Sequence, residues 1–335
     1  MENKKKHILG LDLVRVVAVI LVLTVHFFLH TKYYDSPLTG INMNIQSVIK
    51  NFCLSCVPLF ILLTGFLNNK KEYNKKFFKG LAAIIIIWLF YCIIEFFVLN
   101  IINDNYENLN INNFIYSITS FQAVSYSWYI EMYIGLYLLA PLINVAFDNF
   151  SNSNKKIFTA IIFFLGIGFN FLNIIFKDVI QFPDFWNSIY ILSYYVVGKY
   201  IATIKPKFSK KYLFLLLVIN QLLTFYYQSL DGISVDYNSL TIFTQSVILF
   251  LLIYDINIKN DILKKGISYT ASISLDIYLA SYLVDNIIYS FFFNRYNFNN
   301  LLQQEIIFYA PIILLLVFIF SFCFGVIRKS LIKVR

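Results

Sequence analysis

One apolar stretch near the start of the chain carries the side chains best suited to chemistry. Residues 8–30 are long and apolar enough to cross a membrane, yet they include Asp12, Arg15 and His26. Ionisable side chains at membrane depth are costly, so by default they indicate a functional site. The eleven residues from Arg15 to His26 make roughly three helical turns, so both side chains share one helix face, about 16 Å apart along the axis.

His26 is the residue of this face that can act as a general base, because an imidazole exchanges protons near neutral pH. Glu131, in the apolar run 127–147, is expected at a similar depth, where its carboxylate would fix the tautomer of His26 and raise its basicity. Alternatively, Glu131 caps its helix or reaches interfacial water. No nucleophile elbow, phosphate-binding glycine loop or zinc-ligand cluster is recognisable, so any catalysis is predicted to proceed without a covalent protein intermediate.

Arg15 has two interpretations that the sequence leaves open. Its guanidinium could extend to the cytoplasmic interface and form a structural ion pair with Asp12, which is three residues away on the same face. It could instead contact a substrate, and Asp12 would then hold it in position.

The composition requires a membrane. Of the 335 residues, 59% are hydrophobic and only 13% charged, and the mean hydropathy is +0.69, far from the values of water-soluble proteins. All four cysteines fall within apolar runs, and Cys53-x-x-Cys56 has no second Cys or His pair beside it, so no metal site is expected. The chain is predicted to be an all-α, polytopic transmembrane bundle.

Ten apolar runs of a length that can span the hydrocarbon core recur along the chain. They cover approximately residues 8–30, 47–67, 81–101, 127–147, 157–176, 188–204, 212–228, 239–257, 269–292 and 304–326. The longest polar segment, 102–126, is expected to be a solvated cap, with a substrate lid as the alternative.

The placement of Lys and Arg predicts the orientation, because basic loop residues stay on the cytoplasmic side. With the amino terminus inside, the cytoplasmic segments hold 21 basic residues and the outer segments three, Lys32, Lys177 and Arg295. Both termini are therefore predicted to be cytoplasmic. The net charge of +9 is then a topology signal, which argues against a nucleic-acid partner. Because no stretch suffices for a separate soluble domain, residues 1–335 are expected to form one membrane-embedded domain.

Several motifs resemble a known family. Leu11-Asp12-x-x-Arg15 followed by His26 looks like the opening helix of the acyltransferase 3 family of integral membrane acyltransferases. Later segments are similar to that family's second-helix, Trp-aromatic and late Ser-x-x-Ile-Tyr-Leu patterns, in the same order: Val57-Pro58-Leu59-Phe60 with Thr64-Gly65-Phe66, Ser127-Trp128-Tyr129 through Ala140-Pro141-Leu142, and Ser272 through Leu279. The resemblance covers about residues 8–326, and it implies ten spans with both termini inside.

Such proteins transfer an acyl group, usually acetyl, from an acyl-coenzyme A to a hydroxyl of a cell-envelope acceptor. The resemblance therefore implies an O-acetyltransferase of a bacterial plasma membrane, in contact with membrane lipid. Acetyl-coenzyme A would be its donor substrate, with no bound cofactor, and a cell-surface or lipid-linked polysaccharide its acceptor. His26 would take the acceptor proton, Arg15 would position the thioester or a coenzyme A phosphate, Asp12 would hold Arg15, and Glu131 would orient His26.

Two motifs depart from the family pattern. Members commonly carry Arg-x-x-Arg after the second helix, whereas this chain has Lys79 and Ala82 there, so donor binding is assigned to the lysines Lys75, Lys76 and Lys79. In addition, Ser281 stands where the late helix of the family often has a His.

Three other functions remain possible from the sequence. A transporter or flippase for lipid-linked sugars would use the buried charges as a polar pathway. A glycan polymerase would hold its acceptor in the outer loop, but segment 102–126 contains no Arg. A purely structural membrane protein gives Arg15 and His26 no reason to share a face.

Overall fold

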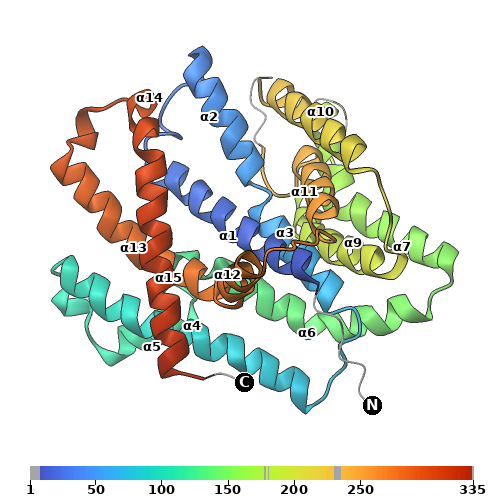
Figure 1. Cartoon of the computed structure of the whole chain (residues 1–335), viewed down its shortest axis with the longest axis horizontal. Coiled ribbons are helices and arrows are strands. Elements are labelled where there is room, and N and C mark those ends of the chain that lie inside the picture. Colours follow the sequence, from blue (N-terminus) through green and yellow to red (C-terminus); the bar gives the residue numbers. More distant parts are fainter. Residues whose placement is uncertain (1–7, 177–178, 180, 230–234, 334–335) are drawn as a thin grey trace. The chain divides into compact units, whose positions relative to one another are not determined.

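A computed structural model describes residues 8–176, 179, 181–229 and 235–333 (Figure 1). The described residues form helices and connecting segments, which confirms the all-α prediction. Each of the ten predicted apolar runs is helical over most of its length. Lys4 to Lys6 and Arg335, which the sequence predicts to be cytoplasmic, and Lys177, predicted to lie outside, fall beyond the described residues.

The chain divides into two compact units. The first unit comprises Met1–Leu29, Tyr33–Lys70 and Asn144–Ser272. Its helices are α1 (Leu9–His30, of which His30 belongs to the second unit), α2 (Gly40–Cys53), α3 (Cys56–Leu67), α7 (Asn152–Phe163), the π-helical turn η3 (Phe164–Gly168), α8 (Phe169–Ile175), η4 (Asp184–Ile189), α9 (Tyr190–Ile204), α10 (Lys210–Ser229), α11 (Leu240–Ile253) and α12 (Asp261–Ser272).

The second unit comprises His30–Lys32, Lys71–Ile143 and Ile273–Arg335. Its elements are α4 (Lys75–Ile102), η1 (Tyr106–Asn108), α5 (Ile111–Thr119), η2 (Ser125–Ser127), α6 (Trp128–Asn149, up to Ile143 in this unit), α13 (Ser274–Arg295), η5 (Phe298–Asn300), α14 (Gln303–Ile306), η6 (Ile307–Tyr309) and α15 (Ala310–Leu331).

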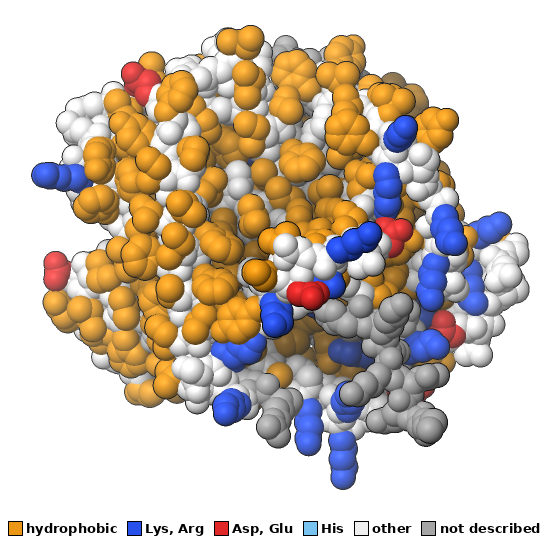
Figure 2. Space-filling view, in the orientation of Figure 1, with side chains coloured by type: hydrophobic (Ala, Val, Ile, Leu, Met, Phe, Trp, Pro, Cys, Tyr) orange, Lys and Arg blue, Asp and Glu red, His pale blue; other side chains and the backbone are white. Residues whose placement is uncertain are grey.

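Six helical segments in the described part of the chain are long and apolar enough to cross a membrane: Leu9–His30, Gly40–Leu67, Lys75–Ile102, Ser125–Asn149, Asn152–Ile175 and Gln303–Leu331. The pair α12 and α13, bent by 64°, would make a seventh span. Helices α9 and α11 have only 15 and 14 residues. Large apolar side chains such as Leu215 and Ile312 are exposed on the helices, and hydrophobic side chains cover much of the face in Figure 2, as a lipid-facing surface requires.

Two predicted spans are broken in the structure. The run 47–67 is interrupted at Leu54 and Ser55, because Pro58 has no N–H and its ring excludes the carbonyl one turn earlier. The amide of Gln245 on α11 donates to the carbonyls of Asn51 and Phe52 at the end of α2, at 3.2 and 3.0 Å. The run 269–292 bends at Ile273, next to Ser272, whose hydroxyl donates back to the Tyr269 carbonyl.

Glycines set the closest helix contact of the first unit, between α3 and α9. A Cβ on Gly65 would overlap the carbonyl oxygen of Tyr195, and a Cβ on Gly198 would overlap the carbonyl oxygen of Leu62. Small residues at such a crossing let two backbones approach directly, which is a principal source of helix association in membranes.

Replacing Gly65 by Ala is therefore expected to destabilise the first unit. Since the obstructing atoms are backbone, α3 and α9 must separate, at a cost of about 1–3 kcal/mol. Gly266→Ala on α12 is the matched control, because nothing lies within 4 Å of its added Cβ. Melting curves of both variants in detergent would test this prediction. Equal melting temperatures for the two variants would contradict the proposed close contact.

Candidate active site

The predicted pairing of Asp12 with Arg15 is present in α1. Arg15 Nη1 donates to Asp12 Oδ1 at 3.0 Å. The Asp12 side chain is only 8% exposed whereas that of Arg15 is 33% exposed. No other contact of the guanidinium is found among the described residues. Asp12 thus anchors Arg15 and leaves most of its N–H donors available to a ligand.

His26 lies near the other end of α1 and is buried, with 6% of its surface exposed. It belongs to the first unit, while Glu131 belongs to the second. Glu131 lies in the first turn of α6, and its side chain is exposed. An acidic side chain at this position also interacts favourably with the positive end of the helix dipole. The assignment of Glu131 as the residue that orients His26 remains a prediction.

The three lysines assigned to the donor occupy the start of α4 and are exposed. Asn74 caps this helix by accepting a hydrogen bond from the Phe77 N–H at 2.9 Å. Cations at the amino end of a helix oppose its dipole, so Lys75, Lys76 and Lys79 do not stabilise α4 there. An anionic ligand bound by these lysines would offset their unfavourable interaction with the helix dipole.

Lys71, which precedes α4, is held against the side chain of Tyr137. Its ammonium donates to the Tyr137 hydroxyl at 2.7 Å and lies 4.0 Å from the centre of the ring. Burial lowers the pKa of Lys71 to about 8, because a low-dielectric environment disfavours the charged amine. Lys71 is thus partly buried, in contrast to the exposed lysines Lys75, Lys76 and Lys79 of α4.

The second unit contains a buried hydrogen-bonded chain that sequence reasoning missed. The Tyr126 hydroxyl donates to Asp285 Oδ2 at 2.9 Å and lies 2.7 Å from His30 Nε2. Because a phenol has a single hydrogen, this arrangement assigns the hydrogen of the second bond to Nε2 of His30. The imidazole also stacks on the Tyr289 ring, with ring centres 4.8 Å apart. Asp285 therefore fixes the tautomer of His30 through Tyr126, in the way that a carboxylate orients a catalytic histidine.

Glu95 on α4 is a second unusual acid of this unit. It is fully buried, and neither carboxylate oxygen has a hydrogen-bond partner among the described residues. A buried, unpaired charge is costly, so the site must be completed by a proton or by a donor from a ligand.

Asp285 lies in the apolar run 269–292. The rule that marks ionisable residues inside spans would have singled it out, whereas its partners could be found only from the fold.

We expect Tyr126→Phe to destabilise the second unit by about 1–3 kcal/mol, because the change leaves the buried Asp285 carboxylate without this donor. Tyr116→Phe on α5 is the control, since Tyr116 is 64% exposed. The two melting temperatures in detergent, measured side by side, check the expectation. A loss that is no larger for Tyr126 than for Tyr116 would show that the chain contributes nothing to stability.

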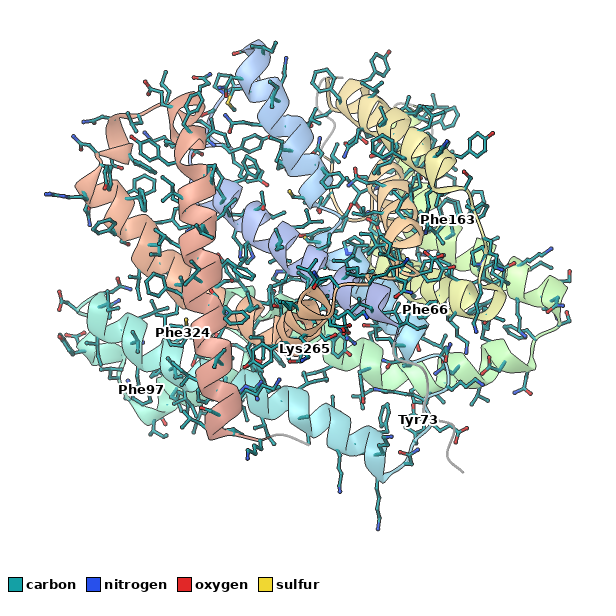
Figure 3. All side chains as sticks on the ribbon, in the orientation of Figure 1. Phe66, Tyr73, Phe97, Phe163, Lys265 and Phe324 are labelled. Atoms are coloured by element: carbon teal, nitrogen blue, oxygen red, sulfur yellow. The ribbon has the colours of Figure 1, made fainter. Side chains whose placement is uncertain are left out.

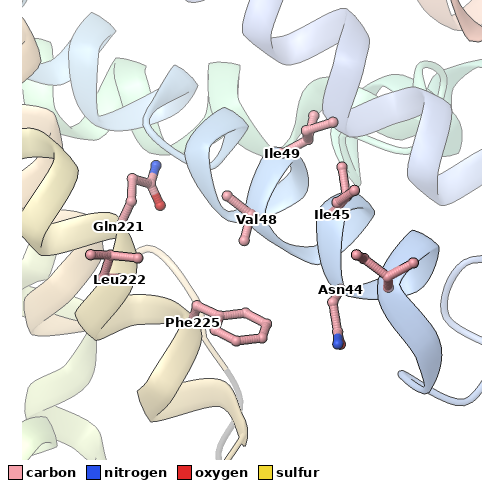
Figure 4. Close-up of a pocket in the computed structure, with 8 residues that line it drawn as sticks. Asn44, Ile45, Val48, Ile49, Gln221, Leu222 and Phe225 are labelled. Atoms are coloured by element: carbon pink, nitrogen blue, oxygen red, sulfur yellow. The ribbon is translucent and has the colours of Figure 1, made fainter.

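An apolar groove of about 410 Å³ lies between α2 and α10 in the first unit (Figure 4). Its lining comprises Ile41, Asn44, Ile45, Val48, Ile49, Gln221, Leu222 and Phe225. It contains no titratable side chain, so it suits a hydrocarbon chain rather than a reaction.

Comparison with known proteins gives one match, to a family model that covers most of the chain. Residues 8–326 match the model of the acyltransferase 3 family, described as an acyltransferase domain. No curated protein and no solved structure matches the chain. The match covers the same residues as the motifs and includes α1 with Asp12, Arg15 and His26.

Proposed function

The chain belongs to the acyltransferase 3 family, and from this premise we propose that it moves acetyl from acetyl-coenzyme A to a hydroxyl of a cell-surface or lipid-linked polysaccharide. The family makes the chain a membrane acyltransferase, which requires an acyl donor and an acceptor. The observation that carries the finer proposal is the face of α1, where a buried His26 follows an Arg15 anchored by Asp12.

In the proposed reaction, His26 accepts the proton of the acceptor hydroxyl while that oxygen attacks the thioester carbonyl. The carbon–oxygen bond forms and the carbon–sulfur bond breaks. The thiolate of coenzyme A then takes the proton from the imidazolium, so charge and protons balance. A general base of this kind contributes about 10²–10⁴-fold to a rate, and Glu131 is proposed to orient the imidazole.

Donor binding is proposed for the guanidinium of Arg15 and the lysines at the start of α4. Arg15 retains N–H donors that can bind a phosphate or a thioester oxygen. Lys75, Lys76 and Lys79 would attract the coenzyme A phosphates as point charges. The distance of about 16 Å between Arg15 and His26 along α1 fits an extended donor, whose phosphates and thioester are far apart.

We propose a ten-span topology with both termini in the cytoplasm of a bacterial cell and with the whole chain as one functional domain. The support is the alternation of basic segments along the sequence. Helices α9 and α11 would then cross with the help of their flanking residues. Arg15 would lie on the donor side of the membrane and His26 on the acceptor side.

The function is tested by transfer of labelled acetyl from acetyl-coenzyme A in membranes that contain the protein and an envelope glycan. We expect label in the glycan, released by mild base as an ester is. Membranes without the protein are the control. Glycan movement or polymerisation that needs no acyl donor, with no labelled ester, would instead support a transporter or polymerase.

Arg15→Leu is expected to raise KM for acetyl-coenzyme A at least 10-fold while kcat falls less, because a lost ion pair with the donor weakens binding before chemistry. Arg15→Lys should recover part of the loss, since it retains the charge but not the planar guanidinium. Steady-state kinetics over a range of donor concentrations check this expectation. An unchanged KM would remove Arg15 from the donor site.

A further inference from the structure

Lys50 in α2 is a buried cation to which the described part of the chain brings no acidic side chain within ion-pair distance. Only 6% of its surface is exposed, and it lies on the buried face of the helix together with Met43, Gln46 and Ser47. Its ammonium donates to Asn51 Oδ1 at 3.2 Å and lies 5.8 Å from the centre of the Tyr34 ring. Among the described residues, no carboxylate comes within 4.0 Å of it.

The cost of this arrangement argues for a ligand. An ammonium has three N–H donors, and among the described residues Lys50 makes one long hydrogen bond, to a neutral amide. A buried charge without a counter-charge is expensive, and an ionisable side chain at membrane depth indicates a functional site by default. Among the described residues, Asp236 is the acid whose charge acts on Lys50, and it is itself exposed and lies beyond ion-pair distance.

Hydrogen bonds hold the side chains and the helix end around Lys50 in place. Asn51, its neighbour, donates to the side-chain oxygen of Gln228 on α10, and Ser47 donates to the same oxygen at 2.5 Å. The helix breaks within one turn of Lys50, and Gln245 holds the broken end through the Asn51 and Phe52 carbonyls. Broken spans with polar side chains at the break are typical of binding sites inside membranes.

One side of this site is accessible. Tyr34, whose ring centre lies 5.8 Å from the Lys50 ammonium, is 55% exposed, so an anion can approach past it. The apolar groove between α2 and α10 is not this entrance, since its α2 residues lie on a different face of the helix from Lys50. The ligand at Lys50 is therefore recognised by charge and by hydrogen bonds from the ammonium.

We propose that Lys50, supported by Asn51, binds an oxyanion of the acceptor substrate. The oxyanion is the phosphate of a lipid-linked sugar or the carboxylate of an acidic sugar. The identity of the ligand as acceptor rests on the proposed function, whereas the binding of an oxyanion does not.

The test measures the melting temperature of the full chain in neutral detergent with four probes. These are a long-chain alkyl phosphate, inorganic phosphate, glucuronate and, as the neutral reference, glucose with the matching long-chain alcohol at equal ionic strength. Wild type is compared with Lys50→Met, Lys50→Arg and the control Lys265→Met, which removes an exposed lysine of α12 (labelled in Figure 3). Met matches the length of Lys without its charge, so Lys50→Met should fold.

We expect at least one anionic probe to raise the melting temperature of wild type and Lys265→Met by a few degrees, as saturating ligands do. Lys50→Met should lose that shift and Lys50→Arg should keep part of it. A shift with alkyl phosphate alone identifies a lipid phosphate, one with glucuronate identifies an acidic sugar, and one with inorganic phosphate identifies a phosphate bound without its lipid.

Two results would overturn the proposal. The first is the absence of any shift with an anion beyond that with its neutral reference. The second is a shift of the same size in Lys50→Met and wild type. No acyl donor is present in this assay, so its failure leaves acyl transfer intact. Absence of acyl transfer by the wild type, in turn, would leave oxyanion binding untouched.

Discussion

Replacing His26 by alanine is expected to reduce acyl transfer about 10²–10⁴-fold, because it removes the proposed general base. The loss should appear in kcat and in kcat/KM alike, since proton transfer occurs in the transition state and not in donor binding. This pattern distinguishes His26 from Arg15, whose loss should act mainly on KM. Labelled-acetyl transfer at saturating donor concentrations measures the effect.

The His26 variant needs controls for folding, because the side chain is buried. His26→Gln retains much of the volume and the hydrogen bonding, yet it cannot accept a proton at neutral pH, so it should be as inactive as His26→Ala. Thr24→Ala is the matched change on the same helix, because the Thr24 hydroxyl donates to the Ile20 carbonyl one turn earlier and has no part in the proposed chemistry. Wild-type rates in a correctly inserted His26→Gln protein would show that His26 is not the base.

The fold could be predicted from the sequence to the extent that it depends on hydropathy. Runs of apolar residues specify helices in a membrane because every backbone group must be paired within its segment. The break at Leu54 and Ser55 is different. Pro58 signals it locally, but Gln245, almost two hundred residues later in the chain, donates to the Asn51 and Phe52 carbonyls at the broken end.

In the candidate site, too, some contacts follow from the sequence and others could be found only from the fold. The ion pair of Asp12 with Arg15 follows from their spacing on one helix, so the sequence predicts it and the structure confirms it. The chain from His30 through Tyr126 to Asp285 joins residues from three distant segments, so their contact could be found only from the fold. Lys50 lies within the apolar run 47–67, so the rule that marks ionisable residues inside spans could have singled it out, whereas the absence of an acidic partner among the described residues could be found only from the fold.

The second large expected effect is a loss of stability when the buried ion pair of Asp276 with Arg328 is broken. Arg328 counts in the sequence as a basic residue of the cytoplasmic tail, but the structure places it inside α15, 4% exposed. Its Nε and Nη2 donate to the two oxygens of Asp276 on α13 at 2.6 and 2.5 Å. The Tyr91 hydroxyl on α4 adds a bond of 3.1 Å to Asp276. One carboxylate thus connects three helices of the second unit.

Breaking this buried pair leaves one charge without its partner, so Asp276→Asn is expected to cost about 3–5 kcal/mol. The double variant Asp276→Leu with Arg328→Met removes both charges and should recover much of that loss, since two desolvated ions give little net stability over apolar side chains. A double-mutant cycle of unfolding free energies in detergent isolates this coupling.

The exposed pair of Asp261 with Lys264 supplies the comparison, because its side chains are 83% and 40% exposed and water screens their attraction. Asp261→Asn should leave the melting temperature nearly unchanged. If Asp276→Asn were as harmless as Asp261→Asn, the buried pair would not hold α13 to α15. If the double variant were as unstable as Asp276→Asn alone, the loss would come from packing or from the Tyr91 bond and not from an unpaired arginine.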